Sequence, residues 1–129
     1  MQTFLPYPDF QKSLECLDYR RFGKQRLETK TLLNGGWPNH PASKMWRGYG
    51  DALRRYLYLN ILEWIGRGYN NTMEIVKIGE PEVYPPWFGD PAFHASHRSN
   101  LLRKNPEWYG QFGWTESPGL PYVWPTWDG

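Results

Sequence analysis

Cysteine is nearly absent from this chain of 129 residues, in which Cys16 is the only one. A single cysteine excludes a disulfide framework and a cysteine-rich metal site. Because Leu14 and Leu17 lie beside it in the sequence, we expect Cys16 to be a buried and unreactive thiol.

Long apolar runs and targeting segments are also lacking. No run approaches the ~18 residues that a membrane helix needs, and no signal peptide is recognisable. Repeats and low-complexity linkers are missing, and the length suits one hydrophobic core rather than two. The net charge of +2 permits a polyanionic partner without requiring one. We therefore predict a single domain over residues 1–129, soluble and cytoplasmic, a monomer with no membrane and no protein partner.

The sequence motifs of several enzyme classes are missing as well. Gly35-Gly36 lacks the following Lys and Ser/Thr of a phosphate-binding loop. No pair of carboxylates stands in a basic setting, which argues against a two-metal nuclease. The serines show no strand–turn–helix elbow, so we do not expect a serine nucleophile.

Aromatic residues, by contrast, make up 18% of the chain, which indicates a core built from Trp and Tyr. The pattern predicts a mainly α fold: one compact domain of about three main helices with long irregular segments rich in Pro and Trp.

Helix boundaries are expected at capping residues, prolines and glycines. We predict a short helix after Pro8-Asp9 and a second over about residues 20–33 that is interrupted or bent near Gly23. A long helix should span about residues 41–67. Another should begin after Asp90-Pro91 and end at Pro106. Residues 70–92 should form an extended crossing segment, in which residues 74–78 are the candidate for a short strand. The tail, residues 117–129, should wrap over the body of the protein.

Residues 93–114 combine histidines, cations and aromatic rings. Cations that hold phosphate beside rings that stack on bases favour a nucleic-acid surface. The alternative is a basic amphipathic helix whose aromatic tail closes a small core. The side chains concerned are His94, His97, Arg98, Arg103, Lys104, Trp108, Tyr109, Phe112 and Trp114.

His94 and His97 are spaced to share one face of a helix, and His40 is the remaining histidine of the chain. No His-Glu-x-x-His motif, cysteine or paired acid accompanies them. We therefore expect no metal and no cofactor, with the histidines donating to phosphate or capping the core. A metal-dependent nuclease built on the histidines is a rival interpretation, in which a chelator would abolish activity.

Glu28 is the single acid in the cationic stretch of residues 20–30. Lys24 lies four residues before it, so a solvated salt bridge on a helix is one interpretation. The other places a lone carboxylate inside a cationic cleft that binds DNA. There the carboxylate would stabilise positive charge on a sugar or move a proton.

Several blocks of sequence give the chain a family resemblance. They are Leu17-Asp18 with Glu28 ten residues later, Asn39-His40-Pro41 before the long helix, Arg67-Gly68-Tyr69-Asn70 at its close, and Pro106-Glu-Trp-Tyr109 followed by Phe112-Gly113. In this order they resemble the pyrimidine-dimer DNA glycosylase family, small phage-type repair enzymes that combine glycosylase and abasic-site lyase activities. The chain is more similar still to a bacterial and phage branch that begins Met-Gln-Thr-Phe-Leu-Pro.

This resemblance implies roles for particular residues. The nucleophile would be the α-amine of Met1, or that of Gln2 if Met1 is removed, and Glu28 would be the acid/base or electrostatic group. Leu27 stands where the family has a basic residue, so Lys24 or Arg26 would supply that charge. Double-stranded DNA would be the partner, and the expected DNA-binding residues are Lys24, Arg26, His40, Trp46, Arg47, His94, His97, Arg98, Arg103, Trp108 and Tyr109. A non-catalytic DNA- or RNA-binding module would use the same surface and is the second alternative.

Overall fold

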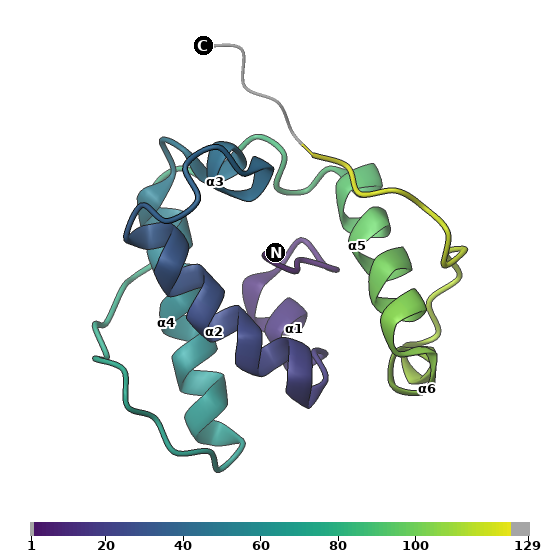
Figure 1. Cartoon of the computed structure of the whole chain (residues 1–129), viewed down its shortest axis with the longest axis horizontal. Coiled ribbons are helices and arrows are strands. Elements are labelled where there is room, and N and C mark those ends of the chain that lie inside the picture. Colours follow the sequence, from purple (N-terminus) through teal and green to yellow (C-terminus); the bar gives the residue numbers. More distant parts are fainter. Residues whose placement is uncertain (1, 125–129) are drawn as a thin grey trace.

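The architecture is mainly helical. A computed structural model describes residues 2–124, and that part contains six α-helices, a short 3₁₀-helix and no strand (Figure 1). The helices are α1 Phe10–Glu15, α2 Tyr19–Leu33, α3 Pro41–Trp46, α4 Gly50–Gly66, α5 Pro91–Lys104 and α6 Pro106–Tyr109, and the 3₁₀-helix spans Gly110–Phe112. The predicted mainly α fold is confirmed. None of the described helices is both long and apolar enough to cross a membrane.

The first two helices begin and end close to the predicted positions. Asp9 caps α1, because its carboxylate accepts a hydrogen bond from the N–H of Lys12 at 2.9 Å. α2 ends at the predicted Asn-Gly-Gly stop, where Gly35 has φ 82°. α2 continues through Gly23 without interruption. A Cβ atom at Gly23 would lie 3.6 Å from the ring of Trp64, which is an ordinary van der Waals contact, so the ring packs on the helix without requiring a glycine there.

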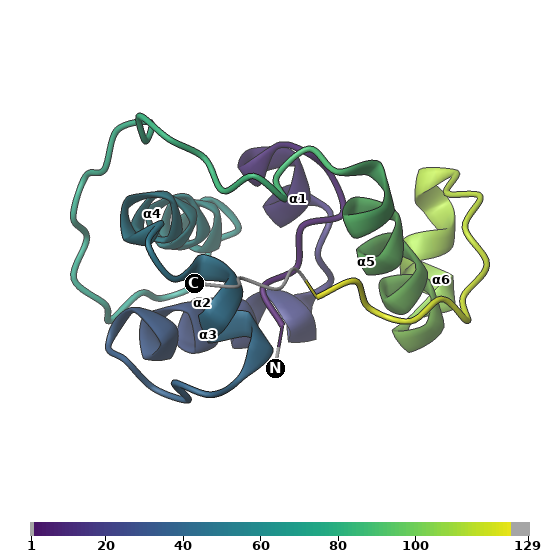
Figure 2. The same cartoon turned by 90° about the horizontal axis from the view of Figure 1, so that it is seen from above.

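The prediction of one long helix over residues 41–67 is wrong. α3 and α4 are separate helices, joined through Arg47, Gly48 and Tyr49 (Figures 1 and 2). Gly48 has φ 87°, in the left-handed region that other residues adopt only with strain. The N–H of Tyr49 donates to the carbonyl of Trp46 at 2.8 Å, which closes a tight turn at the junction. The glycine therefore ends the first helix and lets α4 start in a new direction.

α5 and its neighbouring segments agree better with the predictions. Asp90 caps α5 through the N–H of Ala92 at 3.1 Å, and α5 ends before Pro106. The connection between α4 and α5 is extended, but the short strand considered at residues 74–78 does not form. The tail runs along α5, where the N–H of Leu120 donates to Ser99 Oγ at 3.0 Å. This confirms the expected wrapping for residues 117–124, while residues 125–129 lie outside the described part.

The core is aromatic, as the composition predicts. The ring of Phe10 lies between 5.1 and 6.2 Å, centroid to centroid, from the rings of Trp46, Tyr56, Tyr84 and Phe88. Cys16 is buried, and burial raises the pKa of its thiol to about 12. The thiol is therefore protonated at neutral pH and poorly nucleophilic, as expected.

The N-terminal segment, residues 2–7, occupies the middle of the fold. It threads between α2 and α4 on one side and α5 on the other (Figures 1 and 2). Gln2 and Phe4 are buried, and Thr3 and Leu5 have no exposed surface at all. A buried segment without regular secondary structure needs other partners for its backbone N–H and C=O groups. Side chains of the surrounding helices supply them, and this arrangement positions the candidate site.

Candidate active site

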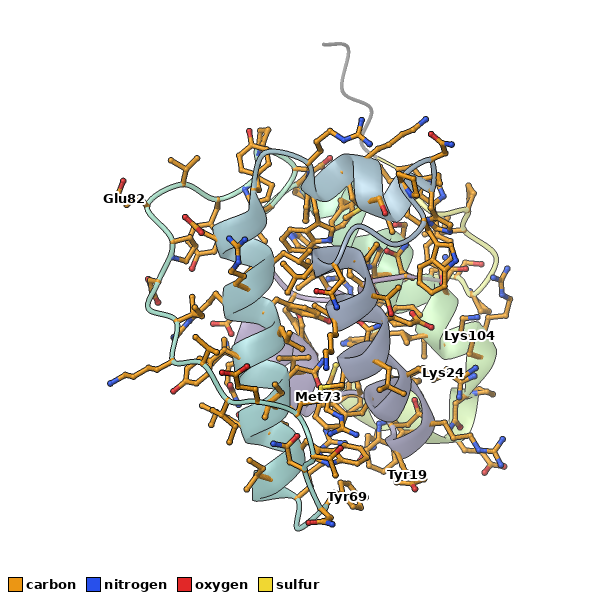
Figure 3. The ribbon with its side chains drawn as sticks, turned by 60° about the vertical axis from the view of Figure 1, so that its left-hand side comes forward. Tyr19, Lys24, Tyr69, Met73, Glu82 and Lys104 are labelled. Carbon is orange, nitrogen blue, oxygen red and sulfur yellow. The ribbon has the colours of Figure 1, made fainter. Side chains whose placement is uncertain are left out.

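A pocket with a volume of about 530 Å³ opens where the N-terminal segment, α2 and the end of α5 meet. It is lined by Gln2, Phe4, Arg20, Arg21, Lys24, Gln25, Glu28, Lys104 and Tyr122. Figure 3 shows two of its cations, Lys24 on α2 and Lys104 on α5, on the same face of the molecule. Four cations against one acid make this lining strongly positive. Such a pocket attracts an anionic group such as phosphate.

The electrostatics of Lys104 reflect this crowding of positive charge. Its pKa is lowered by burial and then by the neighbouring cations Arg21, Arg103 and Lys24. The charges come from two helices that are far apart in the sequence, so only the tertiary fold brings them together. A bound anion would relieve their mutual repulsion.

Glu28 is the only acid in the pocket lining. It is half-buried on α2, one helical turn after Lys24, and shares a helix face with it. Within residues 2–124 its carboxylate makes no hydrogen bond and no ion pair, so the salt bridge to Lys24 that the spacing allowed does not form. Both oxygens are therefore available to a ligand in the pocket.

Gln25, one turn before Thr29 on the same helix, holds the beginning of the chain. Its side-chain amide donates to the carbonyl of Gln2 and accepts from the N–H of Phe4 at 2.8 Å. The hydroxyl of Tyr56 on α4 lies 2.9 Å from the carbonyl oxygen of Phe4 and 2.7 Å from Gln25 Oε1. Burial raises the pKa of Tyr56, so this hydroxyl keeps its proton and acts as the donor.

The two histidines of α5 hold the next residue, Leu5. His97 Nδ1 accepts from the N–H of Leu5 at 2.9 Å, and His94 Nδ1 lies 2.7 Å from its carbonyl oxygen. His94 Nε2 accepts from the N–H of Gly89, so Nδ1 carries the proton and donates to Leu5. Burial lowers the pKa of both rings, that of His97 to about 3. Both are therefore neutral at pH 7 and engaged with backbone groups in the core.

Two further predicted site residues also belong to this arrangement, which we call the N-terminal clamp: Gln25, Trp46, Tyr56, His94, His97 and Arg98. The indole Nε1 of Trp46 donates to Thr3 Oγ1 at 2.9 Å, and Arg98 donates to the carbonyl of Pro6 at 2.7 Å. Trp46 is 3% exposed, which removes its ring from any surface that DNA could reach. The clamp accounts for the buried atoms that bind the N-terminal backbone, whereas the buried His97 Nε2 has no hydrogen-bond partner among the described residues.

Comparison with known families adds an independent finding. A family model described as pyrimidine dimer DNA glycosylase matches residues 1–76, more than half of the chain. This chain belongs to that family. The matched region includes Gln2, Lys24 and Glu28, whereas α5, Lys104 and the block at residues 106–113 lie outside it. Comparison with curated proteins and with solved structures gives no match.

Membership in a DNA glycosylase family points to DNA as the substrate of this chain and to base excision as its activity. Met1, the expected nucleophile, lies outside the described residues. Gln2, the adjacent residue, lines the same pocket as Glu28. In the part of the chain that the structure describes, no group of at least three His, Cys, Asp or Glu side chains is arranged to hold a metal ion.

Other expected DNA contacts of this glycosylase-family chain face away from the pocket. Arg26 lies 4.2 Å above the ring of Trp64 and donates to Asn71. Tyr109 has no exposed surface, and its hydroxyl donates to Asp18 Oδ1 at 2.5 Å. Burial and this bond to Asp18 raise the pKa of Tyr109 strongly. Both residues therefore stabilise the fold.

The remaining members of the predicted set are exposed or half-buried and are spread over several surfaces. Arg47 is bound to the carbonyl of Pro38, and Arg103 to Asn100 on its own helix. Trp108 is 40% exposed and lines a second groove. That groove shares Arg20, Arg21 and Lys104 with the Glu28 pocket and also contains Tyr19 and Tyr69. His40 caps α3 by accepting from the N–H of Ala42 at 3.0 Å.

Sequence reasoning missed Arg20, Arg21 and Lys104 as pocket residues. The first two lie in the cationic stretch that singled out Glu28, so their helix face could have been inferred. Lys104 was expected on a nucleic-acid surface with the rest of residues 93–114, but its place beside α2 is set by the packing of α5 and has no local signal. Gln25 and Tyr56 were missed for the same reason, since their partners are backbone groups distant in the sequence.

Proposed function

We propose that this chain excises a damaged or modified pyrimidine base from double-stranded DNA and then cleaves the abasic site through its N-terminal amine. One observation carries the proposal: the unpaired carboxylate of Glu28 lines a cationic pocket together with Gln2, next to the chain's first residue. The family match supports the glycosylase reaction. The lyase step and the assignment of residues are proposals that rest on the pocket.

The chemistry requires a neutral amine beside an acidic group. An α-amino group has a pKa of about 7.7–8.0, and neighbouring cations lower it further, so a useful fraction is uncharged at neutral pH. The amine of Met1, or of Gln2 if Met1 is removed, attacks C1′ of the deoxyribose. The N-glycosidic electron pair leaves with the base, which takes up a proton. Opening of the sugar ring at O4′ gives an imine between C1′ and the amine nitrogen.

The lyase step follows from the imine. Loss of a proton from C2′ and cleavage of the C3′–O bond release the 3′-side fragment of the strand, which keeps the phosphate at its 5′ end. Water then hydrolyses the imine to free the enzyme. Glu28 stabilises the cationic sugar and moves the C2′ proton. The pocket cations Arg20, Arg21, Lys24 and Lys104 hold the phosphates on either side of the sugar.

The test is reductive trapping. Protein incubated with an abasic duplex and borohydride should form a covalent adduct that maps to the first residue of the purified chain, and blocking the α-amine should abolish the adduct. A chelator should leave the yield unchanged. Tight, salt-dependent DNA binding without an adduct would instead identify a non-catalytic module. Loss of strand cleavage in chelator would identify the metal-dependent nuclease.

A further inference from the structure

The loop between α2 and α3 presents an aromatic ring on a strained backbone. Trp37 has φ 51°, and among residues 2–124 it is the only non-glycine residue with a positive φ. Bulky side chains are rarely found in this left-handed region, and such strain concentrates at functional sites. The ring is 50% exposed and makes no hydrogen bond or ring contact with the described residues. No hydrogen bond or ring–ring contact with the described residues accounts for the strain, and half of the side-chain surface is open to a ligand.

The loop beneath the ring is held rigidly. The N–H of Gly36 donates to the carbonyl of Thr31 at 2.9 Å, and the N–H of His40 donates to the carbonyl of Trp37 at 3.1 Å. The guanidinium of Arg47 donates to the carbonyl of Pro38 at 2.9 Å, and the proline ring restricts the backbone further. A side chain on such a base keeps its direction when it meets a ligand.

This loop lies beside Glu28. Gly36 rests on Thr31 so closely that a Cβ atom at Gly36 would meet Thr31 Cγ2 at 2.4 Å. Thr31 follows Glu28 by three residues on α2, so their Cβ atoms share a helix face at about 5–6 Å. Burial lowers the pKa of His40 at the end of the loop, and the charge of Glu28 opposes that shift. Figure 2 shows the α2–α3 connection and the start of the described chain on the same face of the molecule.

We infer that Trp37 inserts into the base stack of bound DNA and fills the gap left when the target nucleotide turns into the Glu28 pocket. The inference rests on the proposed function, because an enzyme that attacks C1′ must first displace a stacked nucleotide. Aromatic rings stack on any base, and apolar side chains that enter a base step kink the duplex.

Three other rings that the sequence analysis expects to bind DNA are less suited to insertion. Trp46 and Tyr109 are 3% and 0% exposed. Trp108 is exposed but lies in the second groove, where its Nε1 donates to the carbonyl of Cys16 at 2.8 Å. Trp37 alone among these four rings is exposed, rigidly presented and adjacent to the face of α2 that carries Glu28.

The first test separates base displacement from sugar chemistry. With a duplex that contains one thymine dimer, Trp37→Ala should lower the single-turnover rate of base excision by at least about tenfold. The yield of borohydride adduct that this variant forms with a preformed abasic duplex should stay within about threefold of the wild-type yield, since no base remains to be displaced there. Trp37→Phe should restore most of the excision rate. Equal losses on both duplexes, or no loss on either, would overturn the inference.

The second test does not depend on catalysis. Permanganate oxidises thymines that have lost their stacking, so binding of the wild-type protein should raise the reactivity of thymines flanking the dimer. Trp37→Ala should remove that increase at saturating protein, while Val83→Ala, which truncates an exposed apolar residue on the α4–α5 connection, should retain it. Absence of any increase with the wild-type protein would refute insertion. Absence of adduct and excision with a normal permanganate response would instead refute the proposed function alone.

A folding control accompanies both tests. Asn tolerates positive φ, so Trp37→Asn removes the ring and should leave the melting temperature unchanged or raise it. Its loss of excision would then be assigned to the ring. A marked fall in melting temperature in both Trp37→Asn and Trp37→Ala would show that Trp37 supports the fold, which would overturn the inference.

Discussion

A carboxylate that accepts no hydrogen bond from its own protein is available to a ligand, and Glu28 is in that state among the described residues. Cations of the pocket surround it without pairing with it. The absence of a partner matters because a carboxylate in an ion pair would have to give up that partner before it could stabilise a cationic sugar. The absence of a partner among the described residues supports the role that we propose for Glu28 toward substrate.

At this residue the proposed chemistry makes a direct prediction. Glu28→Gln keeps the size of the side chain but removes its charge and its ability to accept a proton. We expect strand cleavage at an abasic duplex to fall by about 10²-fold or more, the range in which positioned acid–base groups contribute. Single-turnover cleavage measures the effect, and affinity for the same duplex should be unchanged or higher, since a negative charge has been removed.

The matched control is Glu82→Gln. Glu82 is exposed on the α4–α5 connection and lies outside the Glu28 pocket (Figure 3). The same loss of charge there should leave the rate of strand cleavage within about twofold of the wild-type rate, because distant exposed charges are screened by salt. If Glu28→Gln behaves like Glu82→Gln, Glu28 has no part in the reaction.

At the scale of elements, α2 links the buried N-terminal segment to the pocket. Gln25 faces the segment and binds the backbone of Gln2 and Phe4, while Lys24 and Glu28 line the pocket. Because these residues lie within one turn of a rigid helix, the position of Gln2 relative to Glu28 is set by hydrogen bonds to α2. A loose terminus would sample many positions and lose the advantage of a held nucleophile.

We predict that Gln25→Met destabilises the protein and impairs catalysis more than binding. Methionine is close in size but leaves the N–H of Phe4 and the carbonyl of Gln2 without a partner, which costs about 1–3 kcal/mol for each buried group. Urea denaturation measures the stability. The yield of borohydride adduct should fall by about tenfold or more, because misplacing a reacting group by ~1 Å has effects of this size or larger. DNA affinity should remain, since the pocket cations are untouched.

Asn100→Leu provides the comparison for that variant. Asn100 is a buried amide on α5 that donates to the carbonyls of Ser96 and Leu120, so its loss also leaves buried groups unpaired. It holds the C-terminal tail, and among the described residues it makes no hydrogen bond to the N-terminal segment. A similar loss of stability with normal trapping in Asn100→Leu would assign the defect of Gln25→Met to positioning. Equal trapping defects in the two variants would contradict that assignment.

At the scale of the whole molecule, the fold depends on neutral histidines. His94 and His97 bridge α5 to the centre of the N-terminal segment, and both bind Leu5. Burial lowers the pKa of each ring below its usual value of 6.5, so the unfolded chain binds more protons than the folded one in mildly acidic solution. This stability is fully present above pH 6.5 and is lost as the pH falls through that value toward about 3.

The free energy of unfolding should therefore decrease by about 2 kcal/mol for His97 alone between pH 7.5 and pH 5, where most carboxylates are still charged. Urea denaturation across this range measures how the free energy of unfolding changes with pH. This dependence should be weaker in His97→Gln, although the variant is less stable than the wild type at pH 7. A wild-type slope of zero between pH 7 and pH 5 would mean that the buried rings gain their protons without opening the fold.

Several features of this protein were determined by the sequence alone. Asp9, Asp90, Pro91 and Pro106 set helix ends through local capping and backbone geometry, which do not depend on the rest of the fold. The order of the short motifs indicated the family, and the isolation of Glu28 among cations indicated the candidate carboxylate. The break between α3 and α4 was also a local matter, signalled by Gly48, but the apolar stripe that continues across it suggested one helix.

Only the tertiary structure decided what the buried polar residues do. Histidine is a residue type that can bind phosphate or a metal ion, and the sequence shows no more than this about His94 and His97. Nothing near them in the sequence indicates that residues 2–7 pass between them and α2. Their roles depend on partners about 90 positions away, and a hydrogen bond to a backbone group leaves no pattern in the sequence. The same holds for Lys104 in the pocket and for the exposed, strained Trp37. The charge and type of each residue can be read at its own position in the sequence, whereas its burial and its hydrogen-bond partners arise only when distant segments pack together.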